Sequence, residues 1–314
     1  MRFIELFAGI GGFRLGLEQA GHKCVYTNEW LKKPASIYEK QFGDKPDTRD
    51  ITTIRGDELP EADLIVGGFP CATFSIAGKR SGFSLEDTRG SLCFEMFRLA
   101  KEREIPYILF ENVKGLLNHD GGRTFRVMLG ALDELGYDCQ WELLDSQNFG
   151  VPQHRERIFL VGNLRGHSRP QVFPIGSATR ENESTDGREP KKREGFFSNI
   201  SPTLDAHYTK GGASRQYVVT QWRRGSFRDY KSDGVPTLTA TMGTGGHNVP
   251  FLVKEGEYRK LTPLECERLQ GFPDNFTKYY ADGTEVSNSE RYERCGRTVS
   301  VPVIKAIGKK LYEF

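Results

Sequence analysis

The fold is decided at residues 2–13, near the start of the chain, which read RFIELFAGIGGF. The apolar run Arg2 to Phe7 predicts a strand, and Phe13 to Ala20 predicts a helix with one apolar face. A strand, a glycine-rich turn and a helix start form a corner that binds nucleotides, because glycines let the backbone approach a ligand. A plain tight connection has the same pattern, so the turn alone leaves both interpretations open.

Short apolar runs and helical patterns alternate through the rest of the first half. The predicted strands are residues 24–28, 64–67, 107–111 and 157–161, and the predicted helices include residues 91–104 and 124–135. Such alternation is typical of an α/β fold with a doubly wound, mostly parallel sheet.

The texture changes after about residue 170. Residues 176–195 are almost wholly polar and charged, and the chain up to Val253 is rich in Gly, Thr, Arg and Lys. From Val299 to Phe314 an amphipathic helix pattern returns, and its apolar stripe needs a surface to pack on. We therefore predict a large domain of residues 1–175 and 290–314, with a smaller domain of residues 176–289 between.

Composition bounds the class of protein. With 314 residues, 37% hydrophobic and 27% charged, the chain is long enough for a globular enzyme with a real core, and a net charge of +2 does not by itself indicate nucleic acid. The six cysteines are far apart and lack zinc-ligand spacing, which predicts reduced thiols and no metal site. Glu5 interrupts the first apolar run, so we expect a cytoplasmic protein with no signal peptide and no membrane partner.

The glycine turn differs from the pattern of dehydrogenases. It reads Gly9-Ile10-Gly11-Gly12-Phe13 rather than Gly-x-Gly-x-x-Gly, which favours an adenosine without a pyrophosphate. Glu29, after the second predicted strand, stands where a ribose-binding carboxylate belongs, although a solvated loop glutamate would have the same position. A dehydrogenase would also leave Cys71 and Glu111 unexplained.

Cys71 ends the string Gly67-Gly68-Phe69-Pro70-Cys71, directly after a predicted buried strand. Cysteine is most often a buried structural residue. Ligands, however, bind at the carboxyl ends of strands in open α/β sheets, and here Pro70 fixes the preceding turn while polar residues follow. This context favours a reactive thiol.

Two further strings place charge near strand ends. Glu111-Asn112-Val113 puts a carboxylate after the strand from Tyr107, and residues 153–157 read QHRER. On a strand, Gln153, Arg155 and Arg157 would share one face, where two guanidiniums suit a carboxylate and a phosphate; a solvated edge strand is the alternative.

Together these strings resemble the bacterial DNA cytosine-5 methyltransferases, nearly from end to end. The matching strings are residues 7–12, 29–30, 50–51, 69–71, 111–113, 153–157, 259–262, 270–273 and 296–303. The resemblance implies a Rossmann-like fold that binds S-adenosylmethionine, and it places the family's target-recognition domain, irregular and β-rich, at the variable residues 176–253.

The resemblance also implies a mechanism. Cys71 would add to carbon 6 of a cytosine flipped out of double-stranded DNA, Glu111 would protonate the ring nitrogen N3, and Arg155 would contact the base. Carbon 5 would then take a methyl group from S-adenosylmethionine. We expect a monomer, with a restriction endonuclease of the same specificity as a possible companion.

The implied site residues form three groups. The catalytic residues are Cys71, Glu111, Arg155 and Arg157. The cofactor-binding residues are Phe7, Gly9, Gly11, Gly12, Glu29, Trp30, Asp50, Ile51, Pro70, Ala72, Leu92, Arg297 and Val299. The DNA-binding residues are Ser75, Lys79, Arg80, Arg89, Gln153, Arg215, Arg223, Arg224, Arg228 and Thr237.

Two positions depart from the family pattern. Ala72 stands where most members have Gln, and Arg297 stands where most have Asn. In the family both positions lie near the transferred group, so we hypothesise a cofactor with a larger or carboxylated transferable group that pairs with Arg297. The catalytic residues alone also leave open an RNA cytosine-5 methyltransferase and a DNA-binding relative with impaired catalysis.

Overall fold

The computed structural model describes residues 1–69, 92–175, 218–223, 226–229, 235–243, 250–254 and 257–312. The chain divides into two compact units. The first unit comprises residues 1–144, 156–174 and 304–314, and the second comprises residues 145–155 and 175–303.

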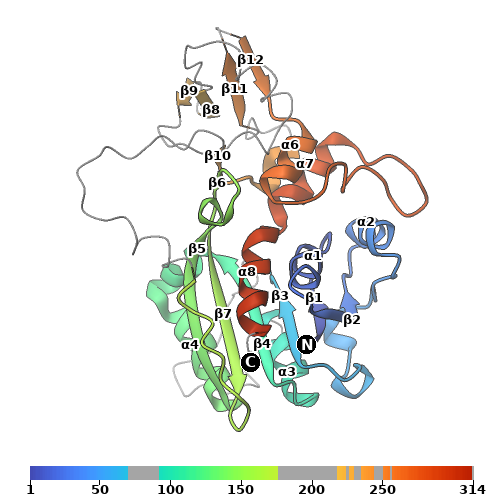
Figure 1. The fold of residues 1–314 in the computed structure, drawn as a ribbon, viewed down its shortest axis with the longest axis vertical. Coiled ribbons are helices and arrows are strands. Elements are labelled where there is room, and N and C mark those ends of the chain that lie inside the picture. Colours follow the sequence, from blue (N-terminus) through green and yellow to red (C-terminus); the bar gives the residue numbers. More distant parts are fainter. Residues whose placement is uncertain are drawn as a thin grey trace. The chain divides into compact units, whose positions relative to one another are not determined.

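Within the described residues, the first unit is built on one six-stranded sheet with the strand order β2-β1-β3-β4-β7-β5 (Figure 1). Its strands are β1 (Arg2–Leu6), β2 (Lys23–Asn28), β3 (Leu64–Gly67), β4 (Tyr107–Val113), β5 (Tyr137–Asp145) and β7 (Glu156–Leu164). Strand β1 pairs in parallel with β2 and β3, β3 pairs in parallel with β4, and β4 pairs antiparallel with β7. The predicted α/β fold with a mostly parallel sheet is confirmed.

Helices of the first unit bury their apolar sides with the sheet. They are α1 (Gly12–Glu18), α2 (Lys32–Phe42), α3 (Leu92–Glu102), α4 (Arg123–Glu134) and the larger part of α8 (Val301–Tyr312), with 3-10 helices η1 (Ile51–Thr53), η2 (Gly56–Glu58) and η5 (Lys114–Gly122). Helices α3 and α4 share one core with β3 and β4, around Phe97, Phe110 and Met128.

The C-terminal helix packs as its amphipathic pattern predicts. Ile304, Ile307 and Leu311 are fully buried. The His22 ring nitrogen Nε2 lies 2.8 Å from the Gly308 carbonyl oxygen, which ties α8 to the residues after α1.

The second unit is small and rich in β-structure. Its described strands β12-β11-β8-β9 form an antiparallel sheet, and β6 pairs in parallel with β10. The bounds are β6 (Gln153–His154), β8 (Val218–Arg223), β9 (Ser226–Asp229), β10 (Val235–Pro236), β11 (Phe251–Lys254), β12 (Glu257–Lys260), η6 (Ser146–Phe149), η8 (Ala240–Gly243), α6 (Pro263–Leu269) and α7 (Asn288–Arg297).

The compact units divide the chain differently from the predicted domains. Residues 145–155, residue 175 and residues 290–303 belong to the second unit rather than the first. The reason is visible in α7, which packs on η8 so closely that a Cβ atom at Gly296 would lie 2.2 Å from the Thr239 carbonyl carbon. Across the described residues, no helix is long and apolar enough to cross a membrane.

Candidate active site

The glycine turn joins β1 to α1 and is fastened to the end of β2. Phe7, Gly9 and Gly11 all have positive φ angles, of 54°, 58° and 86°. A Cβ atom at Gly11 would lie 2.3 Å from Phe42, so both its conformation and its surroundings require glycine. The Gly9 N–H donates to Glu29 Oε2 at 2.7 Å, which holds the turn against the residue that follows β2.

Glu29 and Trp30 offer contrasting groups at the carboxyl end of β2. Glu29 is buried, and its Oε1 accepts from the Leu31 N–H at 2.9 Å. Trp30 is 62% exposed. A buried carboxylate beside an exposed indole combines a hydrogen-bond acceptor with a stacking surface, which are the groups that a ribose and an adenine ring need.

Asp50 and Ile51 follow in the loop after α2. The Asp50 carboxylate caps η1 by accepting from the Thr52 N–H at 3.0 Å and the Thr52 hydroxyl at 2.8 Å. These bonds lower the pKa of Asp50, so it is ionised at neutral pH. Ile51 is buried in the core beneath.

Glu5 is the fourth of the five residues of β1, shortly before the glycine turn. It is fully buried and accepts from the Arg14 N–H at 3.2 Å and the Tyr38 hydroxyl at 3.1 Å. Burial raises its pKa to about 8. Glu5 is not among the predicted site residues, although an acidic residue inside an apolar strand is itself a sign that the side chain has polar partners.

The end of β3 is fitted against the end of β4. A Cβ atom at Gly68 would lie 3.2 Å from Glu111 Oε2, and the Asn112 side-chain amide donates to the Phe69 carbonyl oxygen at 3.0 Å. These contacts fix the backbone that leads to Cys71, while Cys71 itself lies outside the described residues.

Glu111 forms an ion pair with Arg157. Arg157 Nε lies 3.0 Å from Glu111 Oε1, and the two side chains are only 15% and 12% exposed. Strand β7 begins where β4 ends, so the antiparallel pairing brings Arg157 to the carboxyl edge of the sheet. Solvent screens such a pair weakly, so its electric field is strong nearby.

Arg155 has a different environment from Arg157. Its guanidinium is buried in the second unit and donates to the carbonyl oxygens of Leu238 at 3.0 Å, Gly296 at 3.2 Å and Thr298 at 2.8 Å. The chain is not one continuous strand here, because β6 ends at His154 and β7 begins at Glu156. The prediction that these residues share one strand face was wrong.

Gln153 requires a second correction. It is fully buried, its amide donates to the Leu269 carbonyl oxygen at 2.9 Å, and its Oε1 accepts from the Leu238 N–H at 3.0 Å. In this geometry its polar atoms serve the packing of the second unit, so its assignment as a DNA contact does not hold.

The other predicted site residues lie in varied surroundings. Leu92 begins α3 and is half-buried, Thr237 donates to the His154 carbonyl oxygen at 2.7 Å, and Val299 is buried. Arg297 is 57% exposed and pairs with Glu293 at 2.9 Å. Outside the described residues lie Pro70, Cys71, Ala72, Ser75, Lys79, Arg80, Arg89, Arg215 and Arg224, and the description of Arg223 and Arg228 is limited to their strand backbones.

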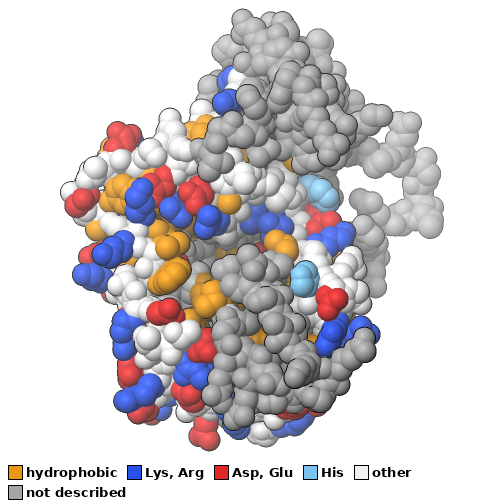
Figure 2. Space-filling model, turned by 180° about the vertical axis from the view of Figure 1, so that it is seen from behind, with side chains coloured by type: hydrophobic (Ala, Val, Ile, Leu, Met, Phe, Trp, Pro, Cys, Tyr) orange, Lys and Arg blue, Asp and Glu red, His pale blue; other side chains and the backbone are white. Residues whose placement is uncertain are grey.

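The described surface carries mixed charge. Figure 2 shows basic and acidic side chains interspersed over one face, with hydrophobic side chains exposed between them and beside the undescribed residues. The mixture agrees with the small net charge of +2. The total charge therefore does not indicate whether the ligand is an anion such as DNA, because a local basic surface can bind an anion at any net charge.

The sheet and the glycine turn define a class of enzyme. A mostly parallel sheet with helices and with an antiparallel β7 next to β4 is consistent with the Rossmann-like fold of methyltransferases that use S-adenosylmethionine. Among solved structures, the S. pombe Dnmt2 methyltransferase shares this fold with a TM-score of 0.67 and 18% identity, covering 100% of this chain and 98% of that one.

The chain belongs to the family of C-5 cytosine-specific DNA methylases, whose profile matches residues 1–313. It is 36% identical to the Type II methyltransferase M.Bsp6I of Bacillus sp. (strain RFL6), covering 100% of this chain and 99% of that protein. It is 34% identical to the Type II methyltransferase M.HhaI of Haemophilus parahaemolyticus, covering 98% and 93%. The resemblance drawn from the sequence is confirmed: the protein is a DNA cytosine-5 methyltransferase with S-adenosylmethionine as methyl donor.

Proposed function

We propose that the enzyme methylates carbon 5 of a cytosine flipped out of a specific double-stranded DNA sequence, through a covalent adduct with Cys71. The observation that carries this proposal is the buried pair of Glu111 and Arg157 beside the end of β3. Because Cys71 follows Phe69 by two residues, the covalent chain keeps their Cα atoms within about 7 Å. We therefore assign the Cys71 thiol, the Glu111 carboxyl group and the Arg157 guanidinium to one catalytic site.

The chemistry explains why these groups are needed together. Carbon 5 of cytosine is a poor nucleophile until the Cys71 thiolate forms a bond to carbon 6. Electrons of the 5,6 double bond are then available at carbon 5, and Glu111 delivers a proton to N3, which prevents charge from accumulating on the ring. After methyl transfer, the N3 proton returns to Glu111, and loss of the carbon 5 proton to a base restores the double bond and expels the thiolate.

The two arginines are assigned different tasks. Arg157 contacts the base, because its guanidinium already lies at the catalytic carboxylate. Arg155 is a positioning residue, since its guanidinium is bonded to three backbone carbonyl oxygens. This refines the sequence prediction, which gave the base contact to Arg155.

The cofactor groups fit an adenosine. Glu29 would hold the ribose hydroxyls, the Trp30 indole would stack on adenine, and the ionised Asp50 would accept from an amine. Phe7, Gly9, Gly11 and Gly12 shape the turn beside them. When bound, S-adenosylmethionine supplies the methyl group, and the chain contributes its orientation toward the base.

DNA must open for this chemistry, because carbon 5 and carbon 6 are not reachable inside the duplex. Flipping the base costs a few kcal/mol, which contacts in the pocket and along the backbone offset. The candidate DNA contacts are Thr237 and, in or beside the undescribed segments, Ser75, Lys79, Arg80, Arg89, Arg215, Arg223, Arg224 and Arg228.

Trapping with a duplex that contains 5-fluorocytosine tests the proposal. The fluorine at carbon 5 cannot leave as a cation, so a methylated adduct should stay attached to Cys71 and survive denaturing electrophoresis. Cys71→Ser should give no adduct, and Glu111→Gln should form it at least about a hundredfold more slowly. Methylation by Cys71→Ser at the wild-type rate would refute the mechanism, and a wild-type chain that binds DNA without any adduct would indicate a catalytically impaired relative.

The cofactor hypothesis concerns Arg297. Arg155 holds the carbonyl groups on both sides of it, which fixes its backbone, while its own guanidinium pairs with Glu293. A carboxylate on the transferable group would take the place of Glu293 in this pair. The measurement is the ratio of turnover with a carboxylated analogue to turnover with S-adenosylmethionine. This ratio should fall in Arg297→Asn, and an unchanged ratio would refute the hypothesis.

A further inference from the structure

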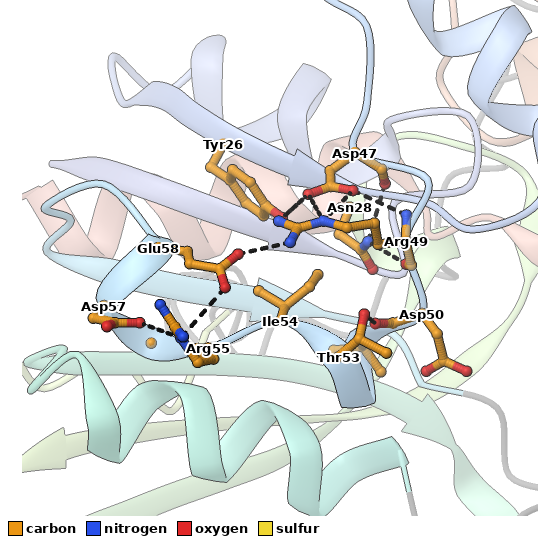
Figure 3. A network of polar contacts seen from close by, with 12 residues as sticks. Tyr26, Asn28, Asp47, Arg49, Asp50, Thr53, Ile54, Arg55, Asp57 and Glu58 are labelled. Carbon is orange, nitrogen blue, oxygen red and sulfur yellow. Dashed lines mark hydrogen bonds and ion pairs between the residues drawn. The ribbon is translucent and has the colours of Figure 1, made fainter.

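Arg49 connects the two ends of the loop that carries Asp50 (Figure 3). Its Nε and Nη2 atoms lie 3.0 and 2.8 Å from Asp47 Oδ2, and its Nη1 atom lies 2.6 Å from Glu58 Oε2. Asp47 precedes the loop and Glu58 lies in η2 beyond it, so one side chain spans the loop from end to end.

The start of the loop is fixed at Asp47, because the Asp47 backbone is hydrogen-bonded to the end of β2 and to Glu29. Its N–H donates to the Thr27 carbonyl oxygen at 2.8 Å, and its carbonyl oxygen accepts from the Glu29 N–H at 3.0 Å. The Asn28 side-chain amide donates to the carbonyl oxygens of both Asp47 and Arg49, each at 3.0 Å. The sheet edge that ends at Glu29 therefore also fixes the residues just before Asp50.

The far side of the loop is held from α3. Arg98 Nη2 donates to the carbonyl oxygens of Ile51 at 3.2 Å and Ile54 at 2.9 Å, and both isoleucines are buried in the core. Asp50 is thus the exposed tip of a loop whose flanks are fixed by Arg49 and Arg98.

We propose that Arg49 is a positioning residue for the cofactor, which sets the place of the Asp50 carboxylate relative to Glu29. The inference rests on the proposed adenosine site. Asp50 adjoins Arg49 in sequence, and the Glu29 backbone N–H donates to the Asp47 carbonyl oxygen. The pair of Arg49 and Asp47 in Figure 3 therefore links the backbone next to Asp50 to the backbone of Glu29.

The exposure of the network separates positioning from global stability. The side chains of Arg49, Asp47 and Glu58 are 49%, 19% and 30% exposed, and ion pairs at such sites contribute little to folding. A loop tip is different, because small shifts of a binding group weaken a ligand without unfolding the chain. Loss of Arg49 should therefore weaken cofactor binding measurably while it changes the melting temperature little.

The experiment compares Arg49→Gln with the matched control Arg165→Gln. Arg165 is also a half-exposed arginine bonded to two carboxylates, Asp133 and Asp138, in the same unit. We expect Arg49→Gln to raise the KM for S-adenosylmethionine and the Kd of S-adenosylhomocysteine about fivefold, with kcat and the melting temperature close to those of the control. Arg49→Lys, which cannot bridge both carboxylates, should fall between. Unchanged cofactor binding in Arg49→Gln would overturn the inference.

A double-mutant cycle with Asp50→Asn shows whether Arg49 acts through Asp50. If it does, Arg49→Gln should have little further effect on KM in the Asp50→Asn background. If the two effects multiply, Arg49 acts independently and the inference fails while the adenosine site stands. If Asp50→Asn alone leaves KM unchanged, the assignment of Asp50 fails, and the inference fails with it.

Discussion

The buried carboxyl group of Glu5 should make the stability of this enzyme depend on pH. Burial raises its pKa to about 8 from 4.5, although hydrogen bonds from Arg14 and Tyr38 partly offset the effect. The folded state therefore holds the Glu5 proton more tightly than the unfolded chain. Its contribution to stability is complete below about pH 4.5 and is lost as the pH rises toward about 8.

The magnitude follows from the two pKa values. A difference of about 3.5 pKa units corresponds to about 5 kcal/mol, of which about 3 kcal/mol is lost by pH 7. Glutamine has the shape of the protonated acid and does not ionise. In Glu5→Gln the side-chain carbonyl oxygen can accept from the Arg14 N–H. The side-chain amide can donate to the Tyr38 hydroxyl oxygen, which is within hydrogen-bond distance of Glu5 Oε2 in the wild type.

Urea unfolding at pH 5, 6, 7 and 8 measures the effect. The free energy of unfolding of Glu5→Gln minus that of the wild type should grow by about 1 kcal/mol per pH unit across this range. Glu134→Gln, at an exposed carboxylate of α4, is the control and should follow the wild type at every pH. Parallel profiles for Glu5→Gln and the wild type would refute the reasoning, because they would mean that Glu5 has an ordinary pKa in the folded protein.

Other substitutions test the remaining geometry. Gly11→Ala forces a side chain into a positive φ angle against Phe42, so we expect a loss of about 2 kcal/mol in unfolding free energy and weaker S-adenosylhomocysteine binding by calorimetry; wild-type binding would contradict the turn as described. Arg155→Gln leaves buried carbonyl groups without donors and should cost about 3 kcal/mol in urea unfolding, and a cost near zero would show that water replaces the guanidinium. Arg157→Met removes the guanidinium that pairs with the buried Glu111 carboxyl group and should destabilise by about 3 kcal/mol, whereas the double change with Glu111→Leu should regain most of that stability without activity. A double variant no more stable than Arg157→Met would contradict this account of the pair.

Local sequence patterns predicted the elements whose residues are uniformly buried, such as β3. Strand β3 was predicted at its observed bounds, because its apolar run is fully buried and is bounded by Asp63 on one side and by Gly67 and Gly68 on the other. Helix α2 and strand β5 were not predicted. Strand β5 lies at the sheet edge and is mostly half-buried, so its sequence lacks a continuous apolar run.

The sequence predicted which residues stand at the strand ends better than it predicted which residues they contact. Glu29 and Glu111 stand at the carboxyl ends of their strands as expected, because the strand ends themselves were marked by apolar runs. The tasks of Arg155 and Arg157 could not be separated from the sequence. Their difference depends on β6 pairing with β10 and β7 pairing with β4, and such pairings join residues far apart in the chain.

Three buried carboxyl groups lie on or directly after strands of the six-stranded sheet. Glu5, Glu29 and Glu111 lie on β1, after β2 and on β4, and each is at least nine-tenths buried. Apolar residues would fill such positions at lower cost, because a buried carboxylate must recover several kcal/mol of desolvation. Their surroundings differ in kind: burial lets Glu5 keep a proton although its two hydrogen-bond donors oppose this, backbone N–H groups hold Glu29 as an acceptor, and a guanidinium gives Glu111 a charged neighbour. The cost of burying a carboxyl group is thus met in three ways, which suit the tasks proposed for these residues: structural support by Glu5, cofactor binding by Glu29 and proton transfer by Glu111.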